Sequence, residues 1–499
     1  MPPQTEKPNQ SARIEAVLRQ HPGVRAARVP DASLGRDELT AYVVPHDEYL
    51  GLALTESDEE RKRIQRWRKT FDLTQMGKET MAPEPDFNIA GWNSSYTRQP
   101  IPAHEMREWV DNTVAEISSL RPQEMLEIGC GTGLLLLRIA PRCKRYMATD
   151  FAPAVLGKLR KQMDQMGGSW DGVELLERPA DNFEGLGEGS FDVVVINSVT
   201  HYFPNASYLT KVMDGAAGLL KQGGKIFIGD VRSLPLLEVY AASVELFQAA
   251  TEMEVAELRE RVARRVKREE QLVISPAFFL ALAERNAKLS GADIRLKRGH
   301  SVNELTRFRY DVVLHAADKR NASTELEWRG WTAAEDGVED IRRMLKDEKP
   351  RRVALTGIRN KRIEKDVEAL ERVSHPDARG TAGELKSELE VAEASGVDPD
   401  DLRSLGDDVG YRVELSWASC QPDGSYDAVL LQTDGGEEGK PLKWPQPSTT
   451  GVELARYANL PGQSVMRERM VQNLLSYCKE NLPEDLVPRV LVVVDALPR

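Results

Sequence analysis

The sequence lacks the features that would place it in a membrane or cross-link it. It contains no uninterrupted apolar run near the roughly 18 residues of a membrane-spanning helix, and its polar residues 1–11 lack the apolar core of a signal peptide. Its 4 cysteines are scattered without C-x-x-C spacing. We therefore expect reduced thiols, no membrane association and a cytoplasmic location.

Charge and histidine content exclude further classes of function. The formal net charge of -12 argues against binding to nucleic acids or anionic membranes, because like charges repel. The 7 histidines form no H-x-x-x-H pattern and no cysteine/histidine cluster, so we expect no metal site. What remains is a globular composition, 41% hydrophobic and 29% charged, over 499 residues. This length has room for about two to four domains.

The most informative stretch is Glu127–Gly133, which joins a short apolar strand to the apolar residues 134–139. Gly129, Gly131 and Gly133 let the backbone approach a ligand, because no Cβ stands in the way. The helix that follows offers unpaired N–H groups to a ligand in the turn. Glycine-rich turns between a strand and a helix also occur as plain packing devices, so the turn alone does not identify a site.

The residues around the turn indicate which ligand it would take. The turn lacks the phosphate-binding G-x-x-x-x-G-K-S/T pattern, and its E-x-G-x-G-x-G spacing differs from the G-x-G-x-x-G of dinucleotide sites. Glu127 suits a cationic ligand better than a pyrophosphate. Asp150 ends the strand-like run 145–149, near the roughly 20-residue offset of a ribose-binding acid. S-adenosylmethionine, a nucleoside that carries a positive sulfonium and an amino acid, fits both.

From 123 to 235 the pattern is β-α-β-α-β-α-β-α-β, which is typical of a doubly wound parallel sheet. The third to fifth strands are expected at 173–177, 191–197 and 225–230, and the segments 292–297 and 309–315 then form a closing antiparallel pair. Ligands bind at the carboxyl ends of such strands. Four polar residues fall at those ends: Glu127, Asp150, Asp181 and Asn197.

The rest of the chain is less informative. Residues 12–48 predict a helix and two strands, a unit too small to stand alone without partner elements. A helix at 465–481 and a strand at 489–495 are expected near the other end. Between them we expect helices at 50–80, 103–120, 236–290, 332–345 and 383–394, a proline-bounded loop at 82–102, and strands at 411–417 and 426–431.

Several longer stretches resemble the methyltransferase domains of nonribosomal peptide synthetases. They are Glu127–Gly133 and the segments 91–96 (GWNSSY), 197–204 (NSVTHYFP), 229–235 (GDVRSLP) and 303–310 (NELTRFRY). In that family the methyltransferase is inserted within the small C-terminal subdomain of an adenylation domain. Residues 14–45 resemble the first half of that subdomain, and residues 482–497 resemble its last helix–strand segment. The resemblance therefore covers nearly the whole chain.

The resemblance implies an α/β fold: a class I S-adenosylmethionine-dependent methyltransferase with a Rossmann-like doubly wound sheet, inserted in a small α+β adenylation subdomain. The implied parts are 12–48 (first half of the subdomain), 60–320 (methyltransferase), 321–458 (an extension of it) and 459–499 (the truncated second half). The large adenylation core and the subdomain's catalytic lysine are absent from this sequence. We therefore expect no amino-acid activation by this chain.

The function implied by the resemblance is methylation of the α-amine of an aminoacyl group. The group would be held as a thioester on the phosphopantetheine arm of a carrier protein, and an adenylation core or other synthetase modules would be further partners. The amine must lose its proton before it attacks, and the thioester should already depress its pKa. Modest help from a general base would then suffice.

The resemblance and the strand pattern together assign roles to individual residues. Candidate catalytic residues are His201, where the family often has glutamine, and Glu304, Asn303 and Tyr96. Histidine can titrate near neutrality, so His201 is a candidate proton acceptor, or else a polar group that orients the substrate. The expected ligands of S-adenosylmethionine are Glu127, Gly129, Gly131, Gly133, Asp150, Phe151, Asp181, Asn182, Asn197 and Trp92.

Each of these residues also has a structural interpretation. Asp150 and Asp181 could cap the helices that follow them, Glu304 could be a surface carboxylate, and Trp92 could pack in the core rather than cover the methyl donor. Two other functions also stay open. One is methylation of oxygen, carbon or sulfur on a side chain, and among these His201 slightly favours carbon or oxygen. The other is a non-catalytic module that docks a synthetase partner.

Overall fold

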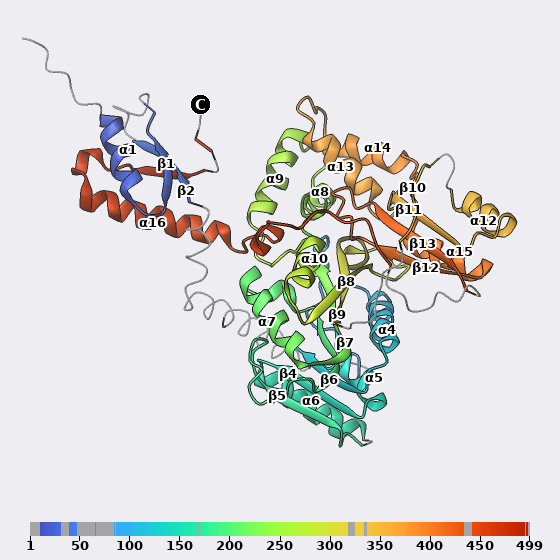
Figure 1. The fold of residues 1–499 in the computed structure, drawn as a ribbon. Helices are drawn as coiled ribbons and strands as arrows, with labels where there is room; N and C mark the ends of the chain where they lie inside the picture. Colours follow the sequence, from blue (N-terminus) through green and yellow to red (C-terminus); the bar gives the residue numbers. More distant parts are fainter. Residues whose placement is uncertain are drawn as a thin grey trace, which may run out of the picture. The chain divides into compact units, whose positions relative to one another are not determined.

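The computed structural model describes residues 10–30, 39–46, 65, 84, 86–167, 169–317, 325–333, 337–433, 442–494 and 496–497. The chain forms two compact units (Figure 1). The first takes residues 1–65, 267–270 and 460–499, and the second takes 66–266 and 271–459. Apart from Gln65, the expected helix at 50–80 lies outside the described residues.

The first unit brings the two ends of the chain together. Its elements are α1 (Gln10–Gln20), β1 (Val24–Arg28), β2 (Thr40–Pro45), α16 (Gln463–Asn481), the 3₁₀ helix η6 (Glu484–Leu486) and β14 (Val490–Val493). β2 pairs with β1 antiparallel and with β14 parallel. Ile14 and Leu18 of α1 pack in one hydrophobic core with Leu474 of α16 and Leu491 of β14. The N-terminal elements thus find the partner elements that their small size requires.

The second unit is built on a seven-stranded sheet of order β5-β4-β3-β6-β7-β9-β8. Its strands are β3 (Glu124–Ile128), β4 (Arg145–Asp150), β5 (Val173–Glu177), β6 (Phe191–Asn197), β7 (Leu220–Arg232), β8 (Leu289–Leu296) and β9 (Arg309–Ala316). β5, β4, β3, β6 and β7 are parallel, and β9 runs antiparallel to β7 and β8. This mainly parallel sheet confirms the predicted α/β fold of the Rossmann-like class.

Helices connect and flank these strands. They are α4 (Ala103–Ser119), α5 (Leu136–Ile139), η2 (Ala140–Arg142), α6 (Pro153–Met166), η3 (Thr200–Tyr202), α7 (Ala206–Leu219), α8 (Leu237–Gln248), α9 (Val255–Lys267), α10 (Pro276–Arg285) and α11 (Glu304–Phe308).

Two predictions about this sheet were wrong. No helix joins β5 to β6, because the linking segment 178–190 carries Gly185 and Gly189 at φ 76° and 61°, outside the helical region. The fifth strand also begins at Leu220, before the Gly223–Gly224 turn, because Leu220 already pairs with Phe191 of β6.

The region after the sheet adds a second, smaller sheet. Its four strands have the order β10-β11-β13-β12. The elements are β10 (Trp328–Gly330), α12 (Val338–Asp347), β11 (Arg352–Ile358), α13 (Glu364–Ser374), α14 (Ala382–Val391), α15 (Pro399–Val409), β12 (Tyr411–Ser416), β13 (Tyr426–Gln432) and the 3₁₀ helix η5 (Leu454–Tyr457). The expected strand pair corresponds to β12 and β13, whereas β10, β11, α13 and α15 were missed. We call residues 325–433 the extension.

The extension shares a hydrophobic core with the helices of the larger sheet. Ala242 of α8 and Leu258 of α9 belong to the same buried cluster as Ala369 of α13 and Leu385 of α14. In Figure 1, α13 and α14 lie beside α8 and α9. The charged helix α9 also forms ion pairs with α8, since Arg261 and Arg265 both pair with Glu245. The extension therefore belongs to the same compact unit as the sheet.

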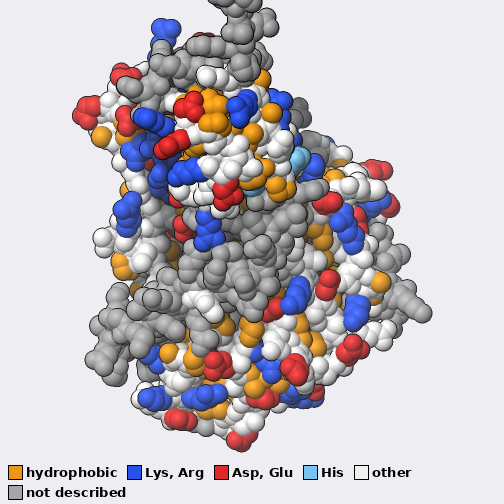
Figure 2. All heavy atoms as spheres, turned by 90° about the vertical axis from the view of Figure 1, so that its left-hand side faces the viewer, with side chains coloured by type: hydrophobic (Ala, Val, Ile, Leu, Met, Phe, Trp, Pro, Cys, Tyr) orange, Lys and Arg blue, Asp and Glu red, His pale blue; other side chains and the backbone are white. Residues whose placement is uncertain are grey.

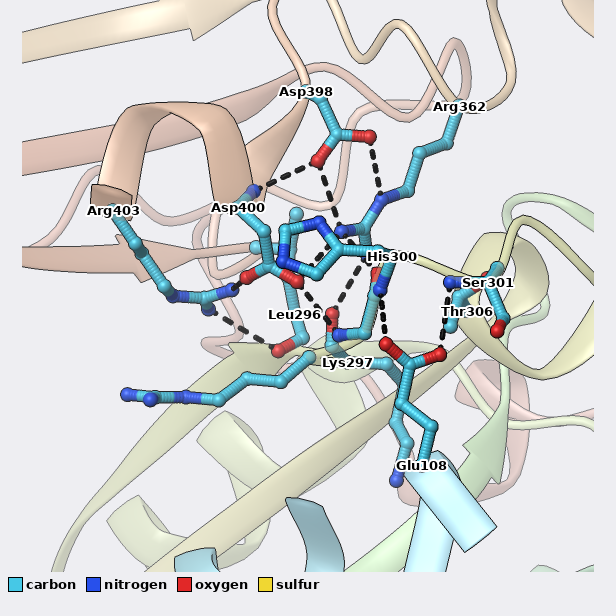
Figure 3. A network of polar contacts seen from close by, with 12 residues as sticks. Glu108, Leu296, Lys297, His300, Ser301, Thr306, Arg362, Asp398, Asp400 and Arg403 are labelled. Atoms are coloured by element: carbon cyan, nitrogen blue, oxygen red, sulfur yellow. Dashed lines mark hydrogen bonds and ion pairs between the residues drawn. The ribbon is translucent and has the colours of Figure 1, made fainter. Parts of the chain in front are cut away.

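A polar network fixes the loop between β8 and α11 to the extension (Figure 3). The buried guanidinium of Arg362 donates to the carbonyl oxygens of Lys297 and Gly299, at 2.9 and 2.8 Å. The same guanidinium pairs with Asp398 and Asp400, each at 3.0 Å. From the opposite side, the Glu108 carboxylate of α4 accepts the backbone N–H groups of 300 and 301. This loop leads directly to Glu304.

Among the described residues, no helix is both long enough and apolar enough to cross a bilayer, and no three or more histidine, cysteine or acidic side chains are grouped to hold a metal ion. All 4 cysteines are unpaired. On the face drawn in Figure 2, lysine and arginine side chains lie among aspartate and glutamate side chains. On this face, the acidic surplus of the chain is not gathered into one block.

Candidate active site

The carboxyl end of β3 carries a buried acid. The Glu127 side chain is only 3% exposed, and its Oε2 accepts a hydrogen bond from the Tyr146 hydroxyl at 2.7 Å. Burial raises the pKa of Glu127 to about 7, against the Tyr146 hydrogen bond, and the nearby Asp150 carboxylate adds to the rise. A positive charge beside Glu127 would therefore be strongly favoured.

The glycine turn that follows is tied to the end of β4. Gly129, Gly131 and Gly133 have φ values of 79°, 51° and 82°, a region that side chains rarely adopt. The Gly131 N–H donates to Asp150 Oδ2 at 2.9 Å, and the N–H of Ala152 donates to Asp150 Oδ1 at 2.9 Å. The N-cap residue of α6 is Ala152, so Asp150 does not cap that helix. Asp150 instead ties the glycine turn to the carboxyl end of β4.

The expected adenine-binding residues lie after β5. Asp181 accepts from the Tyr208 hydroxyl at 2.9 Å and pairs with Lys211 at 2.6 Å. Asn182 is exposed, and its Oδ1 accepts the N–H of Glu184. The Asp181 carboxylate is thus held by side chains of α7. Contact of Asp181, Asn182 and the half-buried Phe151 with an adenine stays a prediction.

Strained backbone marks the ends of β6 and β7. Ser198 follows β6, Asp230 lies near the carboxyl end of the neighbouring strand β7, and their φ values are 56° and 64°. Such values cost a non-glycine residue about 1–3 kcal/mol and cluster at functional sites. Beside them, the buried Asn197 Oδ1 has no hydrogen-bond partner. A Cβ on Gly229 would lie only 2.0 Å from this oxygen, so the glycine makes room for the amide.

Asp230 is the centre of a buried charge cluster. Its carboxylate pairs with Arg309 at 2.5 Å, accepts from Trp109 Nε1 at 3.3 Å and accepts a short hydrogen bond from Ser198. Burial alone would raise the pKa of Asp230, but Arg309 and, more distantly, Lys297 hold it to about 2. This cluster was not among the predicted site residues. The signal that could have revealed it is the position of Asp230 at the end of the predicted strand 225–230, like that of Asp150 at the end of β4.

His201 lies in η3, directly after β6, and is 4% exposed. Its Nδ1 has no hydrogen-bond partner. Burial and, to a smaller extent, the charge of Arg309 lower the pKa of His201 to about 3. This low pKa argues against His201 as a proton acceptor, and its alternative role of orienting the substrate stays a prediction. The ring stays neutral at neutral pH and can accept a hydrogen bond but is a weak proton acceptor.

The loop 86–101 reaches this edge of the sheet through several contacts. The carbonyl oxygen of Asn88 accepts from Thr132 Oγ1 of the glycine turn at 3.0 Å. Trp92 packs on Trp109, with ring centroids 4.7 Å apart, in a hydrophobic cluster that includes Met106. Packing is thus one role of Trp92, and its contact with a methyl donor stays a prediction.

Glu304 holds the tip of this loop. Its Oε2 accepts the N–H of Ser95 at 2.8 Å, and its Oε1 accepts the Ser95 hydroxyl at 2.9 Å. The side chain is 7% exposed, so the alternative of a surface carboxylate was wrong. Its neighbour Asn303 is the N-cap of α11 and donates to Glu105 Oε2 at 2.7 Å. Asn303 thus builds the helix that presents Glu304.

The chain shares extended similarity with known enzymes. Residues 126–226 match the methyltransferase domain family. Over 97% of its length the chain is 37% identical to chondramide synthase cmdD of Chondromyces crocatus, and again over 97% it is 32% identical to the probable non-canonical nonribosomal peptide synthetase CymA of Salinispora arenicola. It spans only 12% and 6% of these two relatives.

The chain contains a methyltransferase domain of the nonribosomal peptide synthetase kind. Among solved structures it shares 16% identity and a TM-score of 0.28 with the N-methyltransferase NodS of Bradyrhizobium japonicum, over 42% of this chain and 97% of that one. The fold assignment rests on the sheet order described above.

S-adenosylmethionine is the cofactor of this methyltransferase domain, and the residues at the strand ends fit it. The glycine turn presents backbone without side chains, which a ligand can approach closely. The buried carboxyl group of Glu127 can pair with the amino group of the cofactor. The unpartnered Asn197 Oδ1 offers a buried acceptor. Contact of Asp150 with the ribose of the cofactor stays a prediction. When bound, the cofactor supplies an electrophilic methyl group on its sulfonium.

A pH profile tests the role of the histidine. We expect no inflection in kcat from His201 between pH 5 and 8, because its pKa lies near 3 and protonation begins only below that window. His201→Gln should keep kcat within about tenfold, since the amide is also neutral and polar, whereas His201→Leu should lose more. An inflection near pH 6–7 that disappears in His201→Gln would contradict this account.

Proposed function

We propose that this methyltransferase domain methylates the α-amine of an aminoacyl group that is held as a thioester on a carrier protein. The observation that carries the proposal is the buried Nδ1 of His201, which has no hydrogen-bond partner and lies directly after β6. A neutral ring nitrogen can accept a hydrogen bond from a neutral amine, which is the form that can attack. The relatives are peptide synthetases by name, which supports an aminoacyl or peptidyl acceptor.

In this proposal the protein positions the reactants rather than activating a poor nucleophile. His201 Nδ1 would accept a hydrogen bond from an amine N–H and orient its lone pair. Orientation alone can supply much of the rate of an in-line displacement. The proton that leaves the nitrogen after transfer needs an acceptor. Glu304 is the candidate, since its carboxylate is buried beside the Ser95 turn.

We also propose that the first unit is a C-terminal subdomain of the adenylation type, interrupted by the methyltransferase. Strand β14 from the end of the chain pairs with β2 from its beginning, which supports one subdomain split by an insertion. An adenylation core and a carrier protein with its phosphopantetheine arm would then be the partners of the full assembly.

A comparison of three acceptors tests the proposed function. We expect methyl transfer to an aminoacyl-carrier protein, at least about 100-fold less to the free amino acid, and none to the N-acetyl-aminoacyl carrier protein. The free amino acid lacks the tether, and the acetyl group removes the nucleophilic lone pair. Equal transfer to the N-acetyl substrate would contradict α-amine methylation and favour the alternative of a side-chain oxygen, carbon or sulfur.

A further inference from the structure

The Ser95–Tyr96 turn at the tip of the loop 86–101 is held from several sides. Besides the two bonds from Ser95 to Glu304, the Gln248 side-chain amide of α8 donates to the carbonyl oxygens of Ser95 and Tyr96, each at 2.9 Å. The Tyr96 ring contacts the ring of Phe247, with centroids 5.4 Å apart. The turn is therefore built against α8 and α11.

A residue of the extension completes this arrangement. Asp366 of α13 accepts from Arg307 Nη1 at 2.9 Å and from the Ser243 hydroxyl at 2.6 Å. Ser243 Oγ lies 2.9 Å from the Tyr96 hydroxyl, and the Arg307 guanidinium lies 5.0 Å from the centre of the Tyr96 ring. Four side chains from four separate segments thus form a closed circuit.

The circuit is largely shielded from solvent, so its polar groups depend on one another as partners. The side chains of Arg307 and Asp366 are 16% and 14% exposed. Burial raises the pKa of Asp366, although Arg307 and the Ser243 hydroxyl oppose the rise. The Arg307 guanidinium lies over the rings of both Tyr96 and Phe308. The guanidinium attracts the two rings only while it stays over their faces. The charged hydrogen bond to Asp366 holds it in that place.

We propose that Asp366 and Arg307 are positioning residues for the methyl acceptor, so that the extension forms part of the active site. Asp366 fixes Arg307 and Ser243, and these two fix Tyr96 and the turn that Glu304 holds. Removal of the charge on Asp366 would let the turn move while the glycine turn and Asp150 stay in place. The choice of acceptor rests on the proposed function, whereas the positioning of the turn does not.

Kinetics of Asp366→Asn test this proposal with a carrier-bound acceptor. We expect kcat/KM for the acceptor to fall about 10-fold to 100-fold, because small displacements of reacting groups are costly. The Kd for S-adenosylmethionine should stay within about twofold, since no residue of the glycine turn is touched. The matched control is Glu371→Gln, which removes an exposed carboxylate from the same helix. This variant should leave both kcat/KM for the acceptor and the Kd for S-adenosylmethionine unchanged.

Hydrogen exchange gives a readout that does not depend on the acceptor. In Asp366→Asn the amides of 91–101 should exchange faster, while those of β3 and β4 should not. Asp366→Asn combined with Arg307→Met should be no worse than the single change, because both break the same circuit. An unchanged kcat/KM, an equal loss of cofactor affinity or faster exchange throughout the unit would overturn the proposal. A wild-type protein inactive on the carrier substrate would instead contradict the proposed function, and the exchange comparison would still decide the positioning role.

Discussion

Gly129→Ala is expected to weaken binding of S-adenosylmethionine by at least about tenfold. At φ 79° an alanine is strained by roughly 1–2 kcal/mol, and its Cβ would lie 2.5 Å from Val199 Cγ2. The turn can relieve both only by moving away from the strand ends where the cofactor binds. Titration calorimetry with S-adenosylmethionine measures the effect, and Gly129→Ala combined with Val199→Ala should recover part of the loss.

Alanine variants of two other glycines serve as controls, because they show the effect of an added Cβ where no atom blocks it. Gly185 has a φ of 76° but open space where a Cβ would stand, and it lies away from the glycine turn in sequence. Gly185→Ala should therefore lower stability by roughly 1–2 kcal/mol, through strain alone, without changing cofactor affinity. Gly157 lies inside α6 with no atom within 4 Å of the added Cβ, so Gly157→Ala should raise stability by about 0.5–1 kcal/mol. Equal cofactor affinities for all three variants would exclude the turn as the binding element.

Asp230→Asn is expected to lower the free energy of unfolding by about 3–5 kcal/mol. The change leaves the charge of Arg309 buried without its partner, and removal of one member of a buried pair is costly. The effect should be greatest above pH 4 and vanish as the pH falls through about 2, the pKa of Asp230, because protonated wild-type protein has lost the same charge. Denaturation by urea, followed by tryptophan fluorescence, measures the change.

Two further variants check that the charge pair is the cause. Asp230→Asn combined with Arg309→Met should recover most of the lost stability, since no unpaired charge remains. Asp340→Asn breaks an exposed pair with Arg343 on α12 and should cost less than about 0.5 kcal/mol. A double variant no more stable than Asp230→Asn would show that the strained backbone or the Ser198 bond matters more than the pair.

The parts of the fold that follow from local patterns were predictable from the sequence. The strands 173–177 and 191–197 match β5 and β6, because each is a short apolar run bounded by turn residues. The link between them carries Gly185 and Gly189, and their backbone angles rule out the expected helix. Strand β11 and helix α13 were missed, because charged residues flank or separate their apolar ones and their cores form with distant segments: β11 packs with β13, and α13 packs with α8 and α9.

The site was predictable where a residue ends a strand and not where contacts come from distant segments. Asp150 lies against the glycine turn as expected, since neighbouring parallel strands end at the same edge. The low pKa of His201 results first from burial and then from the charge of Arg309, 108 residues later in the chain, so no local pattern could reveal it. The same holds for Asp366, whose link to Tyr96 joins residues 270 positions apart.

The most direct test of the proposed function is to locate the transferred methyl group. An aminoacyl-carrier protein is incubated with the full chain and S-adenosylmethionine that carries an isotope-labelled methyl, and the released amino acid is fragmented in a mass spectrometer. The account predicts the label on the fragment that contains the α-nitrogen. A label on a side-chain fragment would contradict α-amine methylation, and no label despite measurable cofactor binding would show that this chain alone does not methylate the carrier-bound amine.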